Sequence, residues 1–211
     1  MSVAEYTFYT HPMSRGQIAR WALHEAGAEY EQVLVNWQDK PADLLVANPM
    51  GKVPTLIHHA LDDDRVVTEC AAICAYLGEA HPNADLSPYD SERADYYRWL
   101  FFAAGPVEQA VTARSMGFEA PPEKQGMAGW GSYERTIDTF ESLFADGRDW
   151  ACGERFTMAD VYVGSQIDWG LTFGSIPPRL GFVAYAERLQ ARGAYKAAKA
   201  IDNALIAEMK K

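Results

Sequence analysis

Two short stretches carry residue types that could take part in binding a ligand. In the first, Lys52 precedes the step Val53-Pro54. The residue before a proline is held extended, and the bond before a proline is the usual place for a cis peptide. In the second, Glu69 and Cys70 stand where a helix is expected to begin, and the N–H groups of a helix N-terminus attract a carboxylate.

The elements that must position these stretches alternate between strand and helix patterns. Gly27 is expected to end the first helix and Thr68 to cap the third. The order is two parallel strands around a helix, then an antiparallel pair joined by a turn at 62–64, which predicts a four-stranded mixed sheet with helices on its faces. We expect strands at 6–9, 30–35, 53–58 and 65–67, and helices at 15–26, 41–46 and 68–80.

The rest of the chain shows helical patterns alone. The proline-containing stretch 81–88 is the expected linker, so an α/β domain spanning 1–82 is followed by an all-helical domain spanning 88–211. Thr157 and Asp160 have the spacing of a capping box, which favours a structural role over a catalytic one. Helices are expected at 91–116, 130–146, 157–172, 179–192 and 193–209.

Charge and composition narrow the classes of function. The 19 Lys and Arg residues stand against 29 Asp and Glu residues, a net charge of -10, which argues against binding to nucleic acid. An anionic ligand would have to be attracted by local basic groups and helix ends. The sequence contains no long apolar run and no basic head with an apolar stretch, so we expect a cytoplasmic protein with no membrane partner. Cys70, Cys74 and Cys152 have neither CxxC nor zinc spacing, so we expect no metal site. Cys70 and Cys74 are four residues apart, and we expect them to be two buried thiols rather than a redox pair.

Four stretches, in this order along the whole chain, resemble the cytosolic glutathione S-transferase family: YTHPMSRG (9–16), NPMGKVPTL (48–56), TECAAI (68–73) and FTMAD (156–160). The resemblance implies a thioredoxin-like N-terminal domain followed by an all-helical domain. It also implies an enzyme that uses glutathione as co-substrate and works as a homodimer.

The resemblance assigns the glutathione-binding residues. It implies that Pro54 is cis and that the main chain of Val53 pairs with glutathione. Glu69 would meet the γ-glutamyl ammonium group, and the N–H of Cys70 would meet the γ-glutamyl carboxylate. Because the family usually has Ser where Cys70 stands, and a thiol is a weaker donor than a hydroxyl, the main-chain amide must do more here.

The glycyl carboxylate is the other anionic end of glutathione. Lys52 resembles the family lysine that meets this carboxylate. Lys40 and Trp37, which follow the second strand, are further candidates for the same end of the ligand.

The group that activates the thiol is left open among several residues. Lowering the pKa of a thiol from about 8.5 by two requires about 2.7 kcal/mol of preferential thiolate stabilisation. A hydroxyl donor with a positive charge nearby suits this task. Ser14 is the first candidate, with Arg15 as electrostatic support, although Ser14 is equally suited to cap the first helix. Tyr9 is the second candidate, since tyrosine-type relatives place their hydroxyl here, and His11 lies near the position that serine-type relatives use.

The implied reaction is attack of the glutathione thiolate on an apolar electrophile, a detoxification chemistry. Two alternatives stay open: peroxide reduction or isomerisation at the same site, and a non-catalytic glutathione-binding or scaffold module. The electrophile is expected in an apolar cleft between the domains. Aromatic and apolar residues that can line it, or equally serve as helix core, are Tyr97, Phe101, Phe102, Met116, Phe118, Trp169 and Phe173.

Overall fold

The computed structural model describes residues 4–59 and 63–210, which fall into two compact units. One unit contains the described residues up to Ser87 together with those from Ala191 onward, and the other contains Pro88–Gln190. The last helix therefore packs with the α/β unit, whereas the sequence pattern places it in a domain spanning 88–211. The residues at 60–62, including Asp62 of the expected turn, lie outside the described part.

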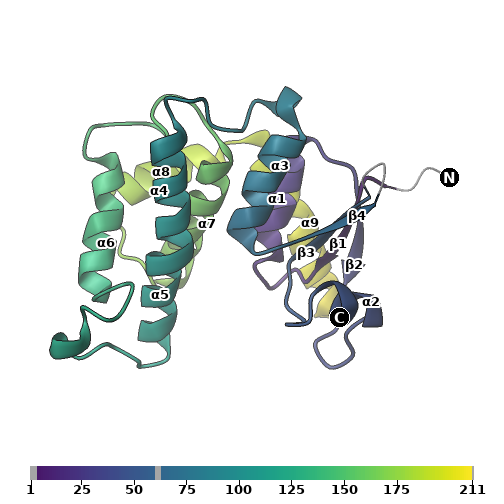
Figure 1. The fold of residues 1–211 in the computed structure, drawn as a ribbon, viewed down its shortest axis with the longest axis horizontal. Helices are drawn as coiled ribbons and strands as arrows, with labels where there is room; N and C mark the ends of the chain where they lie inside the picture. The colour runs from purple at the N-terminus through teal and green to yellow at the C-terminus, as the bar shows by residue number, and fades with distance from the viewer. Residues whose placement is uncertain (1–3, 60–62, 211) are drawn as a thin grey trace. The chain divides into compact units, whose positions relative to one another are not determined.

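The described strands of the first unit form a mixed sheet, as the sequence predicts. β1 pairs in parallel with β2 and antiparallel with β3, and β3 pairs antiparallel with β4. The order across the sheet is β2-β1-β3-β4 (Figure 1). The strands are β1 (Tyr6–Thr10), β2 (Tyr30–Leu34), β3 (Thr55–His59) and β4 (Asp64–Thr68).

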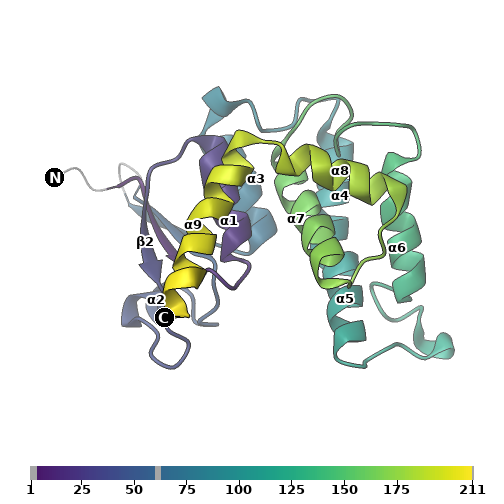
Figure 2. The same cartoon turned by 180° about the vertical axis from the view of Figure 1, so that it is seen from behind.

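Helices of the first unit pack on this sheet and on one another. Helix α1 buries the apolar stripe that its sequence predicts and ends at Gly27, whose φ of 67° is the left-handed conformation of a helix C-cap. Helix α9 lies beside α1 in both views (Figures 1 and 2). The helices are α1 (Gly16–Ala26), α2 (Ala42–Ala47), α3 (Cys70–Ala80) and α9 (Gly193–Met209).

A buried ion pair joins α9 to α1. Arg20 Nε donates to Asp202 Oδ1 at 3.0 Å, and both side chains are essentially inaccessible to solvent. The guanidinium group also lies 5.3 Å from the centre of the Phe8 ring on β1. Nearby, Arg192 donates to both carboxylate oxygens of Glu25 at 2.7 Å. These contacts explain why the last helix belongs to the α/β unit.

The start of α3 differs from the prediction that Thr68 caps this helix, which is wrong. Thr68 still pairs with Thr55 as the last residue of β4. Glu69 occupies the N-cap position instead, with φ 65° and ψ 118°. Because the strand runs directly into the helix, a single residue must make the turn, and Glu69 adopts a positive φ to do so.

The second unit is helical throughout its regular structure. The helix expected at 91–116 is interrupted by one π-helical turn, Ala103–Val107, which contains Pro106. A proline lacks an N–H and clashes with the preceding turn, which accounts for the wider turn. The main helices are α4 (Arg93–Phe102), α5 (Glu108–Ser115), α6 (Tyr133–Glu141), α7 (Met158–Phe173) and α8 (Leu180–Gln190). In the described part of the chain, none of the helices is long and apolar enough to span a bilayer.

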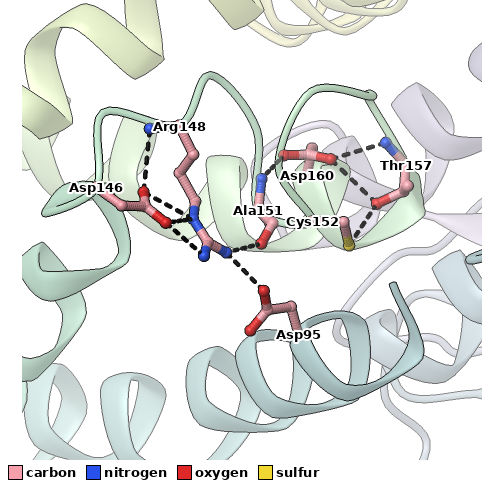
Figure 3. A network of polar contacts seen from close by, with 7 residues as sticks. All are labelled: Asp95, Asp146, Arg148, Ala151, Cys152, Thr157 and Asp160. Carbon is pink, nitrogen blue, oxygen red and sulfur yellow. Dashed lines mark hydrogen bonds and ion pairs between the residues drawn. The ribbon is translucent and has the colours of Figure 1, made fainter. Parts of the chain in front are cut away.

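The predicted capping box at the start of α7 is confirmed. Thr157 N–H donates to Asp160 Oδ2 at 2.7 Å, and Asp160 also accepts from the Ala151 N–H at 2.6 Å (Figure 3). The hydroxyl of Tyr185 on α8 donates to the same carboxyl group at 2.6 Å. Asp160 is completely buried. The box therefore organises the interior of the helical unit and takes no part in a surface site.

Two of the three cysteines, Cys74 and Cys152, have thiols that are buried or half-buried. Cys74 is buried in α3 and Cys152 is half-buried, and no disulfide joins the described cysteines. Burial raises the pKa of the Cys74 thiol well above its usual value and that of Cys152 to about 12. Neither group can act as a thiolate near neutral pH.

Candidate functional site

The end of β1, the loop before β3 and the start of α3 converge at one end of the sheet. Tyr9 pairs with Thr55 across the antiparallel strands, so the residues that follow Tyr9 lie across from those that precede Thr55. Cys70 Sγ donates to the carbonyl of Arg15 at 3.7 Å, which places the first residues of α3 beside those of α1. The structure thus brings together three of the segments that the sequence selects.

The loop before β3 presents an extended main chain. The Val53–Pro54 peptide bond is cis. The carbonyl of Lys52 is held inside the protein, because it accepts from Asn48 Nδ2 at 3.2 Å and from Thr55 Oγ1 at 3.0 Å. Among the described residues, no group pairs with the main-chain N–H or C=O of Val53. These two groups are therefore open to a peptide ligand.

Asn48 is a site residue that the sequence reasoning missed. Besides holding the Lys52 carbonyl, its side-chain oxygen accepts from the Met50 N–H at 3.1 Å and its amide donates to Thr55 Oγ1 at 3.1 Å. Asn favours turns through side-chain bonds of this kind. The pair Asn48-Pro49 at the start of this loop is the sequence pattern that indicates such a turn.

Two lysines lie at the loop end of the site. A Cβ added to Gly51 would lie 3.2 Å from the Lys40 ammonium nitrogen, so Lys40 packs directly against the neighbour of Lys52. Gly51 has φ 58°, a conformation that favours glycine. Lys52 is exposed. The two ammonium groups supply the local positive charge that an acidic chain needs for an anionic ligand.

Glu69 is an exposed, strained residue at the start of α3. A non-glycine residue at φ 65° and ψ 118° costs about 1–3 kcal/mol, and such outliers cluster at ligand sites. The carboxylate stands at a helix N-terminus, where the first N–H groups have no partners inside the helix. The side chain of Cys70 is 7% exposed and its thiol faces the Arg15 carbonyl, so the main-chain amides are what this helix end offers a ligand.

Ser14 is engaged on both sides of its hydroxyl. Its Oγ donates to the carbonyl of His11 at 2.6 Å and accepts from the Gly16 N–H at 3.0 Å. The Ser14 hydroxyl thus satisfies the N–H of Gly16, the first residue of α1, although Ser14 is not the N-cap residue itself. Arg15 is exposed and occupies the N-cap position through its backbone alone.

Tyr9 and His11 are both buried, at 5% exposure each. The Tyr9 ring packs with Val35 and Leu44 on the face of the sheet that α2 covers, and burial raises the pKa of its phenol. The His11 ring lies 4.6 Å from the Trp37 ring, and its Nδ1 accepts from the Met13 N–H at 3.1 Å. Burial lowers the pKa of His11, which favours the neutral imidazole.

The aromatic residues proposed for the second substrate lie on the helical unit. Most of them are exposed, whereas Phe102 and Trp169 are half-buried. The exposed members are Tyr97, Phe101, Met116, Phe118 and Phe173. In the segments that the structure describes, no cluster of His, Cys, Asp and Glu has the arrangement of a metal site.

Fold and site together define a class. A thioredoxin-like unit brings the candidate site residues together at one end of its sheet, and a helical unit follows it along the chain. Residues 4–79 match the family model "Glutathione S-transferase, N-terminal domain", and residues 93–169 match "Glutathione S-transferase, C-terminal domain". The chain belongs to the glutathione S-transferase family.

Individual relatives agree with this assignment. Glutathione S-transferase GstA of Escherichia coli O157:H7 is 29% identical over 153 residues, which are 70% of this chain and 73% of the relative. A glutathione transferase structure from Methylococcus capsulatus is 30% identical with a TM-score of 0.76, covering 94% of this chain and 98% of that one. A sphingomonad glutathione S-transferase, solved in complex with glutathione, is 26% identical with a TM-score of 0.73, covering 93% and 98%.

Proposed function

We propose that this chain is a glutathione transferase that binds glutathione at the convergent end of the sheet and activates its thiol for attack on an apolar electrophile. Two features at the same end of the sheet carry the proposal. The main-chain N–H and C=O of Val53 have no partner among the described residues, and Glu69 has a strained backbone at the start of α3. Each feature matches a different part of one tripeptide.

The ligand can be laid along the site from its chemistry. The cysteinyl main chain of glutathione pairs with the N–H and C=O of Val53 as an added strand. Glu69 receives the γ-glutamyl ammonium, while the first amides of α3, beginning at Cys70, receive the γ-glutamyl carboxylate. Lys52 and Lys40 meet the glycyl carboxylate at the other end. The thiol then lies near the end of β1 and the start of α1.

The reaction balances as a substitution or an addition. The bound thiol releases its proton to solvent, and the thiolate sulfur forms a bond to an electrophilic carbon. With an aryl halide, halide ion leaves with the bonding electrons. Aromatic residues of the helical unit would hold the electrophile, and positioning of the two reactants would supply much of the acceleration. A homodimer, a cytoplasmic location and a detoxification role belong to the same proposal, and sedimentation would measure the first of these.

Calorimetry with glutathione and with S-methylglutathione tests binding, and absorbance of the thiolate against pH tests activation. We expect both ligands to bind, a thiol pKa below its usual value in the complex, and turnover of a model aryl halide. Binding of glutathione without a lowered thiol pKa or turnover would instead favour the non-catalytic module. No binding at millimolar glutathione would refute the proposal.

A matched pair of variants tests the placement of the ligand. Glu69→Gln should weaken glutathione binding about 10- to 100-fold, because a charge-assisted hydrogen bond contributes about 1.5–3 kcal/mol. Affinity for cysteinylglycine, which lacks the γ-glutamyl group, should be unchanged. Glu79→Gln, which removes the same charge from an exposed position at the other end of α3, is the control and should leave affinity unchanged.

A further inference from the structure

His11 directly follows β1, at the end of the sheet where the glutathione thiol is proposed to lie. Tyr9 pairs with Thr55, and continuing this antiparallel register by two residues places His11 across from Val53. On the other side, the Val35 N–H donates to the Thr10 carbonyl at 2.9 Å, which extends the parallel pairing to the residue before His11. The main chain of His11 therefore lies at the carboxyl end of β1, level with the main chain that would hold the cysteinyl residue of glutathione.

The ring of His11 is fixed in orientation and tautomer. Nδ1 accepts from the Met13 N–H at 3.1 Å, so the proton of the neutral ring is carried by Nε2. The Trp37 ring, 4.6 Å away between centres and tilted by 35°, holds the imidazole from one side. In the part of the chain that is described, no group accepts a hydrogen bond from Nε2. One N–H donor thus remains available for a ligand.

The two hydroxyl candidates are already committed. The Ser14 hydroxyl proton is donated to the His11 carbonyl at 2.6 Å, and a hydroxyl has only one proton to donate. The Tyr9 ring packs with Leu44 of α2, whereas α1 packs on the opposite face of the sheet, where Phe8 meets Arg20. The Tyr9 ring is therefore held against Val35 and Leu44.

We infer that the Nε2–H of His11 donates the hydrogen bond that stabilises the glutathione thiolate, and that Ser14 is a positioning residue that holds the His11 carbonyl. The inference rests on the proposed function, since it names the group that activates the same thiol. No covalent bond to His11 forms, and the thiol proton leaves to solvent. A neutral imidazole suits this role because it donates through Nε2 without needing to be protonated.

Two variants with amide side chains, His11→Gln and His11→Asn, distinguish the role of Nε2 from that of Nδ1. The side-chain amide of Gln reaches the position of Nε2, so His11→Gln keeps a donor there, while His11→Asn keeps an acceptor near Nδ1 and loses the donor. We expect His11→Asn to raise the pKa of the bound glutathione thiol by about one to two and to slow aryl halide turnover 10- to 100-fold. His11→Gln should retain most of both, and Ser14→Ala should raise the thiol pKa less than His11→Asn.

S-Methylglutathione binding separates activation from structure, because this ligand has no thiol proton. Its affinity should be the same for wild type and His11→Asn, which shows that the variant is folded and the cradle intact. In the wild type, long-range proton–nitrogen NMR should find the proton of His11 on Nε2. A lowered thiol pKa that is equal in wild type and His11→Asn, or a proton on Nδ1, would overturn the inference while leaving the proposed function in place. Failure of the wild type to bind glutathione would overturn both.

Discussion

Replacing Asp160 by alanine should destabilise the helical unit more than any comparable change at its surface. The carboxyl group is completely buried and accepts four hydrogen bonds. Two come from main-chain N–H groups at 2.6 and 2.7 Å and one from the Thr157 hydroxyl at 3.1 Å (Figure 3). The fourth comes from the Tyr185 hydroxyl at 2.6 Å. Alanine removes every acceptor. The main-chain donors of Ala151 and Thr157 are both at fully buried residues and cannot turn to water.

The size of the stability loss follows from the two main-chain N–H groups that are left without an acceptor. Each unsatisfied buried N–H costs about 1–3 kcal/mol, so the two amides together set a loss of about 2–6 kcal/mol. Asp160→Asn keeps one oxygen and should lose about half as much. Tyr185→Phe removes one donor and leaves the other three bonds intact, so about 1 kcal/mol is expected. In the double variant Asp160→Ala/Tyr185→Phe the two losses should not add, because they share one hydrogen bond.

Urea unfolding followed by circular dichroism measures these free energies of unfolding. The variants are compared with one common m value, the slope of the unfolding free energy against urea concentration. The matched control is Asp138→Ala on α6, which removes an exposed carboxylate that pairs with Arg179 at 2.6 Å. A surface ion pair of this kind contributes about 0–1 kcal/mol. If Asp160→Ala cost no more than Asp138→Ala, or if the double variant were strictly additive, the reasoning from buried donors would be refuted.

Three further changes act on the α/β unit. In Gly16→Ala the new Cβ would lie 2.1 Å from Thr10 Oγ1, so denaturant unfolding should show a free energy of unfolding that is lower by about 1–3 kcal/mol. Adding Thr10→Ala should recover most of this stability, because the Thr10 hydroxyl is buried without a partner. Asp202→Ala leaves the Arg20 charge buried and should cost about 3–5 kcal/mol by calorimetry, and a loss under 1 kcal/mol would contradict the buried pair. Burial lowers the pKa of His24 from 6.5, so its stabilising contribution is complete above that pH and is lost as the pH falls through the folded-state value. His24→Gln should make this decline less steep, by at most about 1.4 kcal/mol per pH unit, and an unchanged slope would contradict it.

Local patterns predicted the α/β sheet well because they depend on near neighbours. The aromatic and β-branched run at the start of the chain forms β1, and Gly27 ends α1 with the positive φ that its type favours. Thr68 was assigned as a cap by residue type alone. Its place is decided by pairing with Thr55 on another strand, which a local pattern does not contain. The strained backbone of Glu69 follows from that pairing, so a local sequence pattern could not predict it either.

The sequence predicted which segments form the site better than it predicted which side chain faces the thiol. Residue types and spacing selected Val53, Glu69 and the segment after β1, and these meet at one end of the sheet. Which group faces a thiol depends on hydrogen bonds between neighbours in a loop. A Ser at a helix start can either donate to a ligand or to a carbonyl three residues earlier, and only the loop geometry shows that Ser14 donates to the His11 carbonyl.

The placement of α9 fixes the position of α1, the helix that begins beside the proposed thiol position. Arg20 and Asp202 are separated by 182 positions, so no local pattern links them, yet the buried pair joins α9 to the helix whose first residues form the thiol position. The N-terminus of α1 is held from the sheet side by Thr10 against Gly16 and from the outer side by α9, where Lys199 donates to Gln17 at 2.8 Å. A hydrogen bond to sulfur depends on fractions of an ångström. The residues that fix the axis of α1 therefore set the thiol geometry as directly as the residues that would touch glutathione.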